Sequence, residues 1–262
     1  MKQQIQTLHA EFIKLKHSKI VWITFIAFSI APIMGALLIP IIQDSASSAN
    51  TGALAAKAKA MNLEANWESY LDILTQAVGV GGIMIFGFVI SWIFGREYSD
   101  GTAKDLLSLP TSRTKILNAK FLLFILWCSL LAISNLLLAF ILGKLIQLPP
   151  TDTRSLVQPL SDYLITTALT IIVMVPVAFF TLWGKGYLAP LGFVALILVF
   201  AQVIAATGYG TYFPWSVPGL YSGVGGEFKV LLNNFSYGIL ILTGIFGYIA
   251  TIKYWNYTDQ TQ

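Results

Sequence analysis

Hydrophobic residues are gathered in six long runs that are separated by polar stretches. The runs extend over Ile20–Ile42, Val78–Gly95, Phe121–Leu142, Tyr163–Trp183, Tyr187–Thr207 and Phe235–Ile252. Each run is long enough to cross a hydrocarbon core of roughly 30 Å as an α-helix, which needs about 20 apolar residues. Barrel strands would instead alternate apolar and polar residues. The pattern predicts an all-α membrane protein with six transmembrane helices in a single transmembrane domain, residues 1–262.

A shorter amphipathic segment precedes the first run. Ile5, Leu8, Phe12 and Leu15 recur at three- and four-residue spacing within residues 3–18, which is typical of a helix with one apolar face. Such an interfacial helix rests on the head-group region, and its lysines favour anionic lipid. A basic flank that only fixes topology is the alternative. A cleaved signal peptide is disfavoured because the apolar run that follows is too long.

Composition and charge agree with lipid as the main solvent. Hydrophobic residues make up 56% of the chain and charged residues only 11%, whereas an average soluble domain has about 25% charged residues. With the N-terminus inside, eleven of the 16 Lys and Arg residues fall in cytoplasmic segments. The positive-inside rule therefore predicts that both termini are cytoplasmic. No basic stripe with interleaved aromatic residues points to a nucleic-acid partner.

The loop between the second and third runs has the most specific local pattern, GREYSDGTAKDLLSLPTSR over residues 95–113. Asp100-Gly101 is a turn signal. Thr102 followed by Asp105 resembles a capping box that opens a short helix, and Pro110 ends it. The pattern predicts a short helix that projects on the cytoplasmic side and is suited to contact a soluble partner. An ordinary structured turn between antiparallel helices is equally compatible with it.

The segment between the fifth and sixth runs is rich in aromatic residues and is interrupted by glycines and prolines. Pro214, Trp215 and Pro218 lie at its centre. Exposed aromatic side chains at this density would be costly in a free external loop. The segment is therefore predicted to be re-entrant and to dip back to the membrane interface, where Trp and Tyr are favoured. A simple aromatic belt is the alternative.

Several kinds of functional group are missing from the predicted spans. None carries Asp, Glu, Lys or Arg near its centre, which disfavours a secondary carrier or channel, because ion coupling needs groups that titrate. The sequence has no P-loop, nucleophile elbow or zinc motif, so no catalytic residue, metal site or resident cofactor is expected. Gly87, Ser91 and Gly95 repeat at four-residue spacing, which allows close helix packing within the chain or a dimer face.

The loop motif and the topology together resemble the type-two ATP-binding-cassette (ABC) permeases. In that family an Arg-Glu pair precedes a Gly-Thr turn, and a Pro and an Arg lead into the third span. Here the corresponding stretches are Arg96–Thr102 and Leu109–Arg113. Chain size and the segment Pro214–Pro218 are most similar to the bacitracin-resistance and lantibiotic-immunity branch.

The resemblance implies a function and a set of partners. It places the following residues at or beside the contact with a separate ABC-type ATPase subunit: Arg96, Glu97, Asp100, Gly101, Thr102 and Arg113. ATP and Mg would be bound by that subunit, so the chain itself would be no enzyme. The resemblance also implies a second permease copy or a sister permease, a bacterial cytoplasmic membrane, and ATP-driven export of a hydrophobic or amphipathic substrate such as a peptide antibiotic. A non-transporting membrane anchor or assembly subunit is the alternative.

Overall fold

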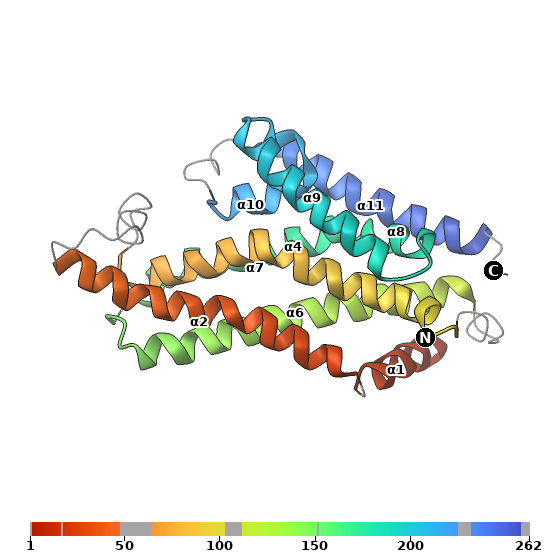
Figure 1. The fold of residues 1–262 in the computed structure, drawn as a ribbon, viewed down its shortest axis with the longest axis horizontal. Helices are drawn as coiled ribbons and strands as arrows, with labels where there is room; N and C mark the ends of the chain where they lie inside the picture. The colour runs from red at the N-terminus through yellow and green to blue at the C-terminus, as the bar shows by residue number, and fades with distance from the viewer. Residues whose placement is uncertain are drawn as a thin grey trace.

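The computed structural model describes residues 2–16, 18–47, 64–102, 112–150, 152–224 and 232–257, which contain helices and no strand. The helices are α1 (Lys2–Lys16), α2 (Lys19–Ser47), α4 (Trp67–Ser99), α6 (Arg113–Leu145), α7 (Thr153–Met174), α8 (Val177–Trp183), α9 (Leu188–Ala206), η1 (Gly210–Tyr212), η2 (Pro214–Ser216), α10 (Val217–Tyr221) and α11 (Asn234–Tyr257) (Figure 1). The predicted all-α fold is confirmed. The predicted short cytoplasmic helix after Thr102 lies outside the described residues.

Six helical segments are long and apolar enough to cross a membrane, as predicted. The second and third are longer than the apolar runs, because α4 and α6 continue into polar residues at their ends. At the start of α4 the Asn66 side chain accepts a hydrogen bond from the Ser69 main-chain N–H at 2.8 Å, which caps the helix. The fourth span consists of two helices, α7 and α8, because Pro176 lacks the N–H that would continue the helix.

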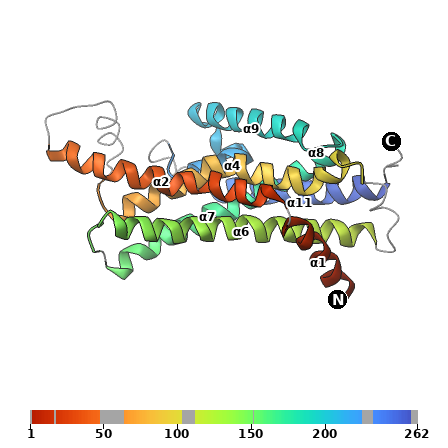
Figure 2. The same ribbon diagram turned by 60° about the horizontal axis from the view of Figure 1, so that its bottom comes forward.

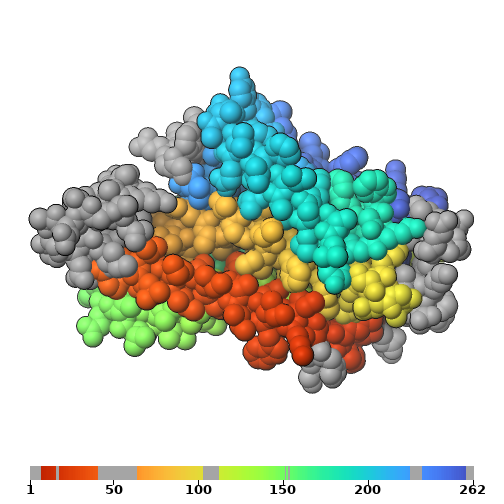
Figure 3. Space-filling model, in the orientation of Figure 1, coloured from red at the N-terminus to blue at the C-terminus, as the bar shows by residue number. Residues whose placement is uncertain are grey.

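Helix α4 lies at the centre of the arrangement, in contact with α2, α6, α7, α8 and α9. Figures 1 and 2 show α2, α4, α6 and α7 running side by side, and in Figure 1 α9 and α11 are inclined to them. In the space-filling view α9 and the residues that follow it form a peak at the upper edge of the molecule (Figure 3). Helix α1 and the C-terminal end of α11 lie at the same end of the molecule, as an even number of crossings requires.

The amphipathic N-terminal helix is held to its neighbours by one edge of its predicted apolar face. Helix α1 lies against α6, and Leu15 and Glu11 are buried there, with 6% and 3% of their surface exposed. Phe12, another residue of the predicted apolar face, is 57% exposed on the protein, and its predicted contact with the head-group region stays a prediction. Glu11 is buried beside Leu15 because it lies one helical turn away and finds cationic partners on the neighbouring helices.

Pro32 in α2 accounts for a buried polar residue in α6. Pro32 lies inside α2 and has no N–H, so the carbonyl oxygen of Phe28 lacks its usual donor within the helix. The Asn135 side-chain Nδ2 donates to that oxygen at 2.8 Å, and Asn135 is 1% exposed. This hydrogen bond between helices supplies the missing donor and fixes α6 against the part of α2 that precedes Pro32.

Candidate functional site

Five charged residues from three helices meet at the end of the molecule where α1 lies. We call this the ion cluster; it consists of Glu11 and Lys14 on α1, Arg96 and Glu97 on α4, and Lys120 on α6. Lys120 is its centre, since its Nζ lies 2.7 Å from Glu97 Oε1 and 3.6 Å from Glu11 Oε2. The Lys120 ammonium also donates to the carbonyl oxygen of Ile93 at 2.7 Å. One lysine therefore holds all three helices together.

The remaining cations complete the ion cluster. Lys14 Nζ lies 2.7 Å from Glu11 and 3.5 Å from Glu97. Arg96 lies 3.7 Å from Glu11 and 3.5 Å from Glu97, and its guanidinium carbon lies 4.8 Å from the centre of the Trp92 ring, a cation–π contact. Both carboxylates thus have three cationic neighbours each.

The ion cluster is largely removed from water. Glu11, Glu97 and Lys120 are 3%, 4% and 2% exposed. Burial alone would raise the pKa of Glu11, but the neighbouring Lys120 and Lys14 ammonium groups outweigh it and hold this pKa below its usual range. Charges buried in this way depend on one another, because removing one partner from a buried pair costs about 3–5 kcal/mol.

The residues predicted to contact an ATPase subunit divide into a buried and an exposed group. Glu97 is buried inside the ion cluster and Arg96 is nearly so. Asp100, Gly101 and Thr102 are exposed in the turn that ends α4. Gly101 has a φ of 71°, the left-handed region that glycine favours after a helix, and the Thr102 N–H donates back to the Glu97 carbonyl at 2.9 Å.

Arg113 lies at a different place from the ion cluster. It is the first residue of α6, and its guanidinium donates to the carbonyl oxygen of Trp255 near the end of α11 at 3.3 Å. Tyr98 reaches the same residue from α4, because the Tyr98 and Trp255 rings meet edge to face with centres 6.0 Å apart. Arg113 therefore connects the start of the third span to the last span, and its predicted proximity to an ATPase contact stays a prediction.

Glu11 and Lys120 were not predicted as functional residues. Lys120 was counted only as a cytoplasmic charge, although it lies two turns inside α6. A signal was present for both: Glu11 falls between Leu8 and Leu15 on the apolar face of α1, and Lys120 precedes Phe124 by one helical turn on a buried face. A charge at a position where the helical period requires an apolar residue indicates a buried ion pair.

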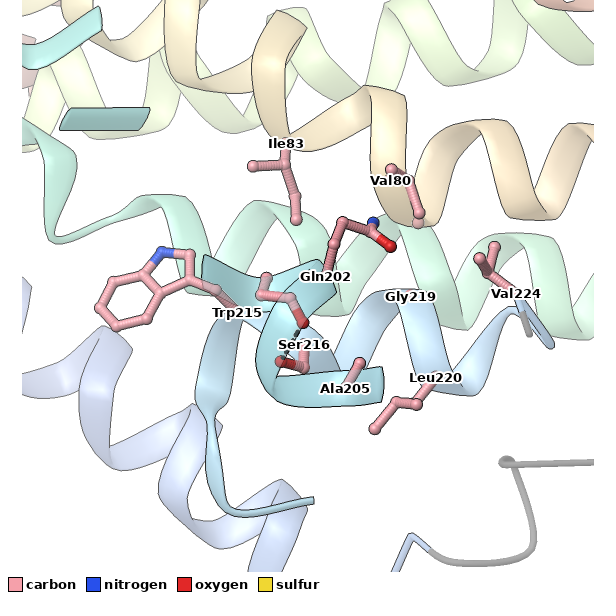
Figure 4. Close-up of a pocket in the computed structure, with 11 residues that line it drawn as sticks. Val80, Ile83, Gln202, Ala205, Trp215, Ser216, Gly219, Leu220 and Val224 are labelled. Atoms are coloured by element: carbon pink, nitrogen blue, oxygen red, sulfur yellow. Dashed lines mark hydrogen bonds between the residues drawn. The ribbon is translucent and has the colours of Figure 1, made fainter. Parts of the chain in front are cut away.

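The predicted re-entrant segment folds back onto the helices as η1, η2 and α10, which contact α4, α7, α9 and α11. Pro214 and Pro218 are buried and Trp215 is partly buried. The Ser216 hydroxyl donates to the Ala201 carbonyl of α9 at 3.1 Å, which fixes the segment to that helix (Figure 4). Its predicted position at the membrane interface stays a prediction.

Gln202 of α9 lies beside this segment, at the meeting point of two hollows. The first is a small cavity of about 20 Å³, in which Figure 4 shows Gln202 between Val80 and Ser216. The second is an open groove of about 540 Å³ between α4 and α9, lined by Val80, Val199 and Gln202 with the partly buried Gln76. Gln202 is exposed on an otherwise apolar span, so its amide is a polar group at a surface where lipid offers no hydrogen bond.

Gly87, Ser91 and Gly95 serve helix packing within the chain. A Cβ atom on Gly87 would lie 2.7 Å from Val194 Cγ1 of α9, and one on Gly95 would lie 2.8 Å from the backbone of Gly186. Ser91 is fully buried between them along the same face of α4. The predicted close approach is therefore made to α9 and to the turn that precedes it, and this face is covered by the chain's own helices.

Within the ranges that the structure describes, no group of three or more His, Cys, Asp and Glu side chains forms a possible metal site. Two polar features bear on function, the ion cluster at one end of the molecule and the Gln202 groove on the α9 side. The first links an amphipathic helix to two spans by charge. The second offers a polar group on a membrane-exposed surface. Neither has the nucleophile and base geometry of an active site.

Comparisons with known proteins agree with this arrangement. Residues 7–202 match a family described as "ABC-2 family transporter protein". The chain is also 27% identical over 192 residues to the bacitracin transport permease protein BCRB of Bacillus licheniformis, an alignment that covers 73% of this chain and 92% of that relative. The match includes α1 from Thr7 onward, the ion cluster and Gln202, which is its last residue.

Proposed function

We propose, from the premise that this chain belongs to the ABC-2 family of transporter proteins, that it is the membrane-spanning subunit of an ATP-driven exporter. The chain is a transport permease subunit of a multi-pass membrane complex. Under the proposal, a separate ABC-type ATPase subunit supplies ATP and Mg²⁺, and a second permease copy or a sister permease completes the membrane part. The substrate is hydrophobic or amphipathic, such as a peptide antibiotic, so that export provides resistance or immunity.

The observation that carries the proposal is the position of the ion cluster. It lies between the amphipathic helix α1, the end of α4 just before the exposed Asp100–Thr102 turn, and the beginning of α6. A push on the exposed turn or on α1 therefore acts through buried charges on two spans at once. Packed interiors transmit such displacements because they do not deform continuously. This is the connection that a permease needs if its energy comes from a soluble subunit.

The Gln202 groove supports the choice of an apolar or amphipathic substrate. Its lining is mainly aliphatic, with the amides of Gln76 and Gln202 as its polar groups. Ligand sites of this composition bind apolar surfaces and use a few polar groups for orientation. A second permease placed against α9 would cover the exposed Gln202 amide and close the groove into a path between two copies. On this proposal the path opens when ATP binding closes the ATPase pair.

The coupling contact is tested by reversing one exposed charge. Asp100→Arg lies in the exposed turn and leaves the ion cluster intact, so the variant should fold normally and lose its copurifying ATPase. Glu68→Arg is the matched control, since Glu68 is an exposed carboxylate at the opposite end of the same helix. The readouts are mass spectrometry of proteins retained on the affinity-tagged chain in mild detergent, and the size-exclusion profile of the chain.

Transport is tested separately from recruitment. The copurified complex is reconstituted in vesicles, and ATP turnover is measured with and without a cyclic peptide antibiotic, in the native chain and in Gln202→Leu. If the peptide stimulates ATP turnover in the native chain and stimulates it less in Gln202→Leu, the result supports an exporter whose substrate path includes the Gln202 groove. A stable ATPase complex whose turnover ignores peptides and whose vesicles move none would establish the anchor alternative instead.

A further inference from the structure

A third hollow lies between α1, α2 and α6, away from the Gln202 groove. It has a volume of about 180 Å³ and is lined by Phe12 and Leu15 of α1, Phe25 of α2, and Leu126 and Trp127 of α6, among other residues of the same helices. Every side chain that lines it is aliphatic or aromatic. We call it the α1 cavity. For comparison, an apolar cavity of about 150 Å³ in a protein core stays dry and binds benzene.

The α1 cavity lies directly below the ion cluster along two helices. On α6, Trp127 follows Lys120 by seven residues, which is two helical turns on the same face, or about 10 Å along the axis. On α1, Leu15 follows Glu11 by four residues, again on the same face. Because α6 enters its span after Lys120, the charged groups lie toward the membrane surface and the cavity lies deeper. The ion cluster and the α1 cavity together therefore have the layout of a lipid site, with a position for a head group above a position for a hydrocarbon chain.

The ion cluster has an excess of positive charge. Three cations, Lys14, Arg96 and Lys120, face two carboxylates. The side chains of Arg96 and Lys120 are 11% and 3% exposed, whereas that of Lys14 is 38% exposed. The uncompensated charge is therefore accessible at Lys14, where a single negative charge from outside would balance the cluster.

The cavity is open on its membrane side. Phe12 and Leu126 line it and are 57% and 51% exposed, so hydrocarbon has a lateral route into it. Its inner wall is also connected to the charges. The Trp127 ring meets the Trp92 ring edge to face with centres 5.8 Å apart, and Arg96 lies over Trp92. An occupant of the cavity therefore contacts Trp127, whose ring packs against the Trp92 ring under Arg96.

We propose that the α1 cavity binds one acyl chain of an anionic phospholipid, whose phosphate is held by the exposed ammonium group of Lys14. The lipid fills the space under α1 and neutralises the excess charge of the ion cluster, so it fastens α1 to α6 from the membrane side. Charge complementarity selects an anionic head group, and the open apolar lining selects a hydrocarbon chain. This inference concerns a bound lipid and does not depend on which substrate the permease moves.

The experiment uses the full chain in nanodiscs that contain phosphatidylcholine and a trace of photoreactive lipid. The probe carries a diazirine on one acyl chain and has either a phosphatidylglycerol or a phosphatidylcholine head group. After illumination, mass spectrometry of peptides locates the label along α6. We expect labelling concentrated around Leu126 and Trp127, and several times stronger for phosphatidylglycerol.

Three variants separate the parts of the proposal. Leu126→Trp fills the cavity and should reduce labelling there at least several-fold, and Leu130→Trp serves the same purpose from the deeper end. Leu137→Trp is the matched control, since Leu137 is an exposed leucine of α6 outside the cavity, and it should leave labelling unchanged. Lys14→Gln should lower phosphatidylglycerol labelling to the phosphatidylcholine level without moving the labelled position.

Two results would overturn the proposal. Labelling spread evenly along the exposed side of α6, including the Leu137 region, and unaffected by either cavity-filling variant would show ordinary contact with bulk lipid. Labelling of the cavity at equal strength by both head groups in the native chain would remove the role of Lys14. Monodisperse elution of each variant, with unchanged labelling near Leu137, shows that the chain has kept its fold.

Discussion

Lys120→Met should release α1 from the rest of the molecule. The substitution keeps a long unbranched side chain but removes an ammonium group that lies 2.7 Å from Glu97 and 3.6 Å from Glu11. Both carboxylates remain buried, with Arg96 and Lys14 as their cations. Glu11 is the carboxylate that can reach water easily, because it is carried by a short surface helix that can move away. We therefore expect undocking of α1 before any loss of the spans.

The structure sets the expected magnitude. At an effective dielectric constant of about 20, charges at these two distances attract by roughly 6 and 5 kcal/mol before desolvation is subtracted. Desolvation offsets part of this, and removing one partner of a buried pair costs about 3–5 kcal/mol in practice. Taking the lower figure, the ratio of undocked to docked α1 should rise by about 100-fold, since about 1.4 kcal/mol corresponds to a factor of ten.

The assay measures how fast a buried cysteine on α1 reacts with N-ethylmaleimide. Leu15→Cys provides the reporter, in a Cys128→Ala background that removes the single native cysteine. Lys120→Met should speed labelling by about 100-fold, since labelling follows the open population. Lys144→Met, at the exposed far end of α6, is the control and should change nothing. A second reporter, Leu240→Cys in α11, should stay protected and show that the spans remain folded.

A labelling rate that changes by less than about threefold in Lys120→Met would refute the reasoning, because it leaves under about 0.7 kcal/mol for the loss of this ammonium group. The double variant Lys120→Met with Glu97→Gln adds an independent check. It removes one charge of each sign, so the labelling rate should return part of the way to that of the native chain. A double variant that labels as fast as the single one would mean that the two groups act independently.

Three further outcomes follow from the described contacts. The pKa of Glu11 is lowered on folding, so its contribution to the docking free energy of α1 is complete above its ordinary pKa of 4.5 and is lost only as the pH falls through the lower pKa of the folded chain. Helix α1 should therefore stay docked down to about pH 4.5. Labelling of the Leu15→Cys reporter with an acid-tolerant dipyridyl disulfide measures this, and release of α1 near pH 6 would contradict it. Asn135→Leu should cost about 1–3 kcal/mol of unfolding free energy in thermal melts, since it leaves without a donor the Phe28 carbonyl that Pro32 cannot bond. The cost should shrink in a Pro32→Ala background, and equal costs in both backgrounds would argue against this link. Gly87→Ala should destabilise by about 1–3 kcal/mol because its Cβ would overlap Val194, and Val194→Ala should relieve most of that loss in the same melts.

Much of the fold could be predicted from the sequence because lipid imposes a simple rule. A span must be apolar over its whole length, so each run is visible without knowledge of its neighbours. The ends of the helices were less visible. Helix α4 starts at Trp67, well before the apolar run, because Asn66 supplies a cap and the helix then continues through polar residues. The break at Pro176 was not predicted, because the fourth apolar run was taken as one span; the structure divides it into α7 and α8, and α8 packs against α11.

The candidate site was only half predictable for a related reason. Arg96 and Glu97 belong to a recognisable local motif, whereas Glu11 and Lys120 acquire their importance from each other. They come together because α1 folds back onto α6, a contact between segments far apart in the chain. Burial changes the role of such a residue. From the sequence, Lys120 was taken as a charge at the end of a span that helps to set the topology. Because α6 starts two turns earlier, Lys120 lies inside the helix and is the centre of the ion cluster.

The ion cluster also affects how this chain is assembled during synthesis. Glu11 leaves the ribosome early, but two of the cations that neutralise it, Arg96 and Lys120, belong to spans that are made much later. Until those spans are in place, Lys14 is the one member of the ion cluster's three cations that Glu11 can pair with. A span inserted with the wrong orientation would carry Arg96 or Lys120 to the opposite side of the membrane. Docking of α1 thus requires that the spans carrying Arg96 and Lys120 have been inserted in the correct orientation. In a chain with one of these spans inverted, α1 would remain undocked.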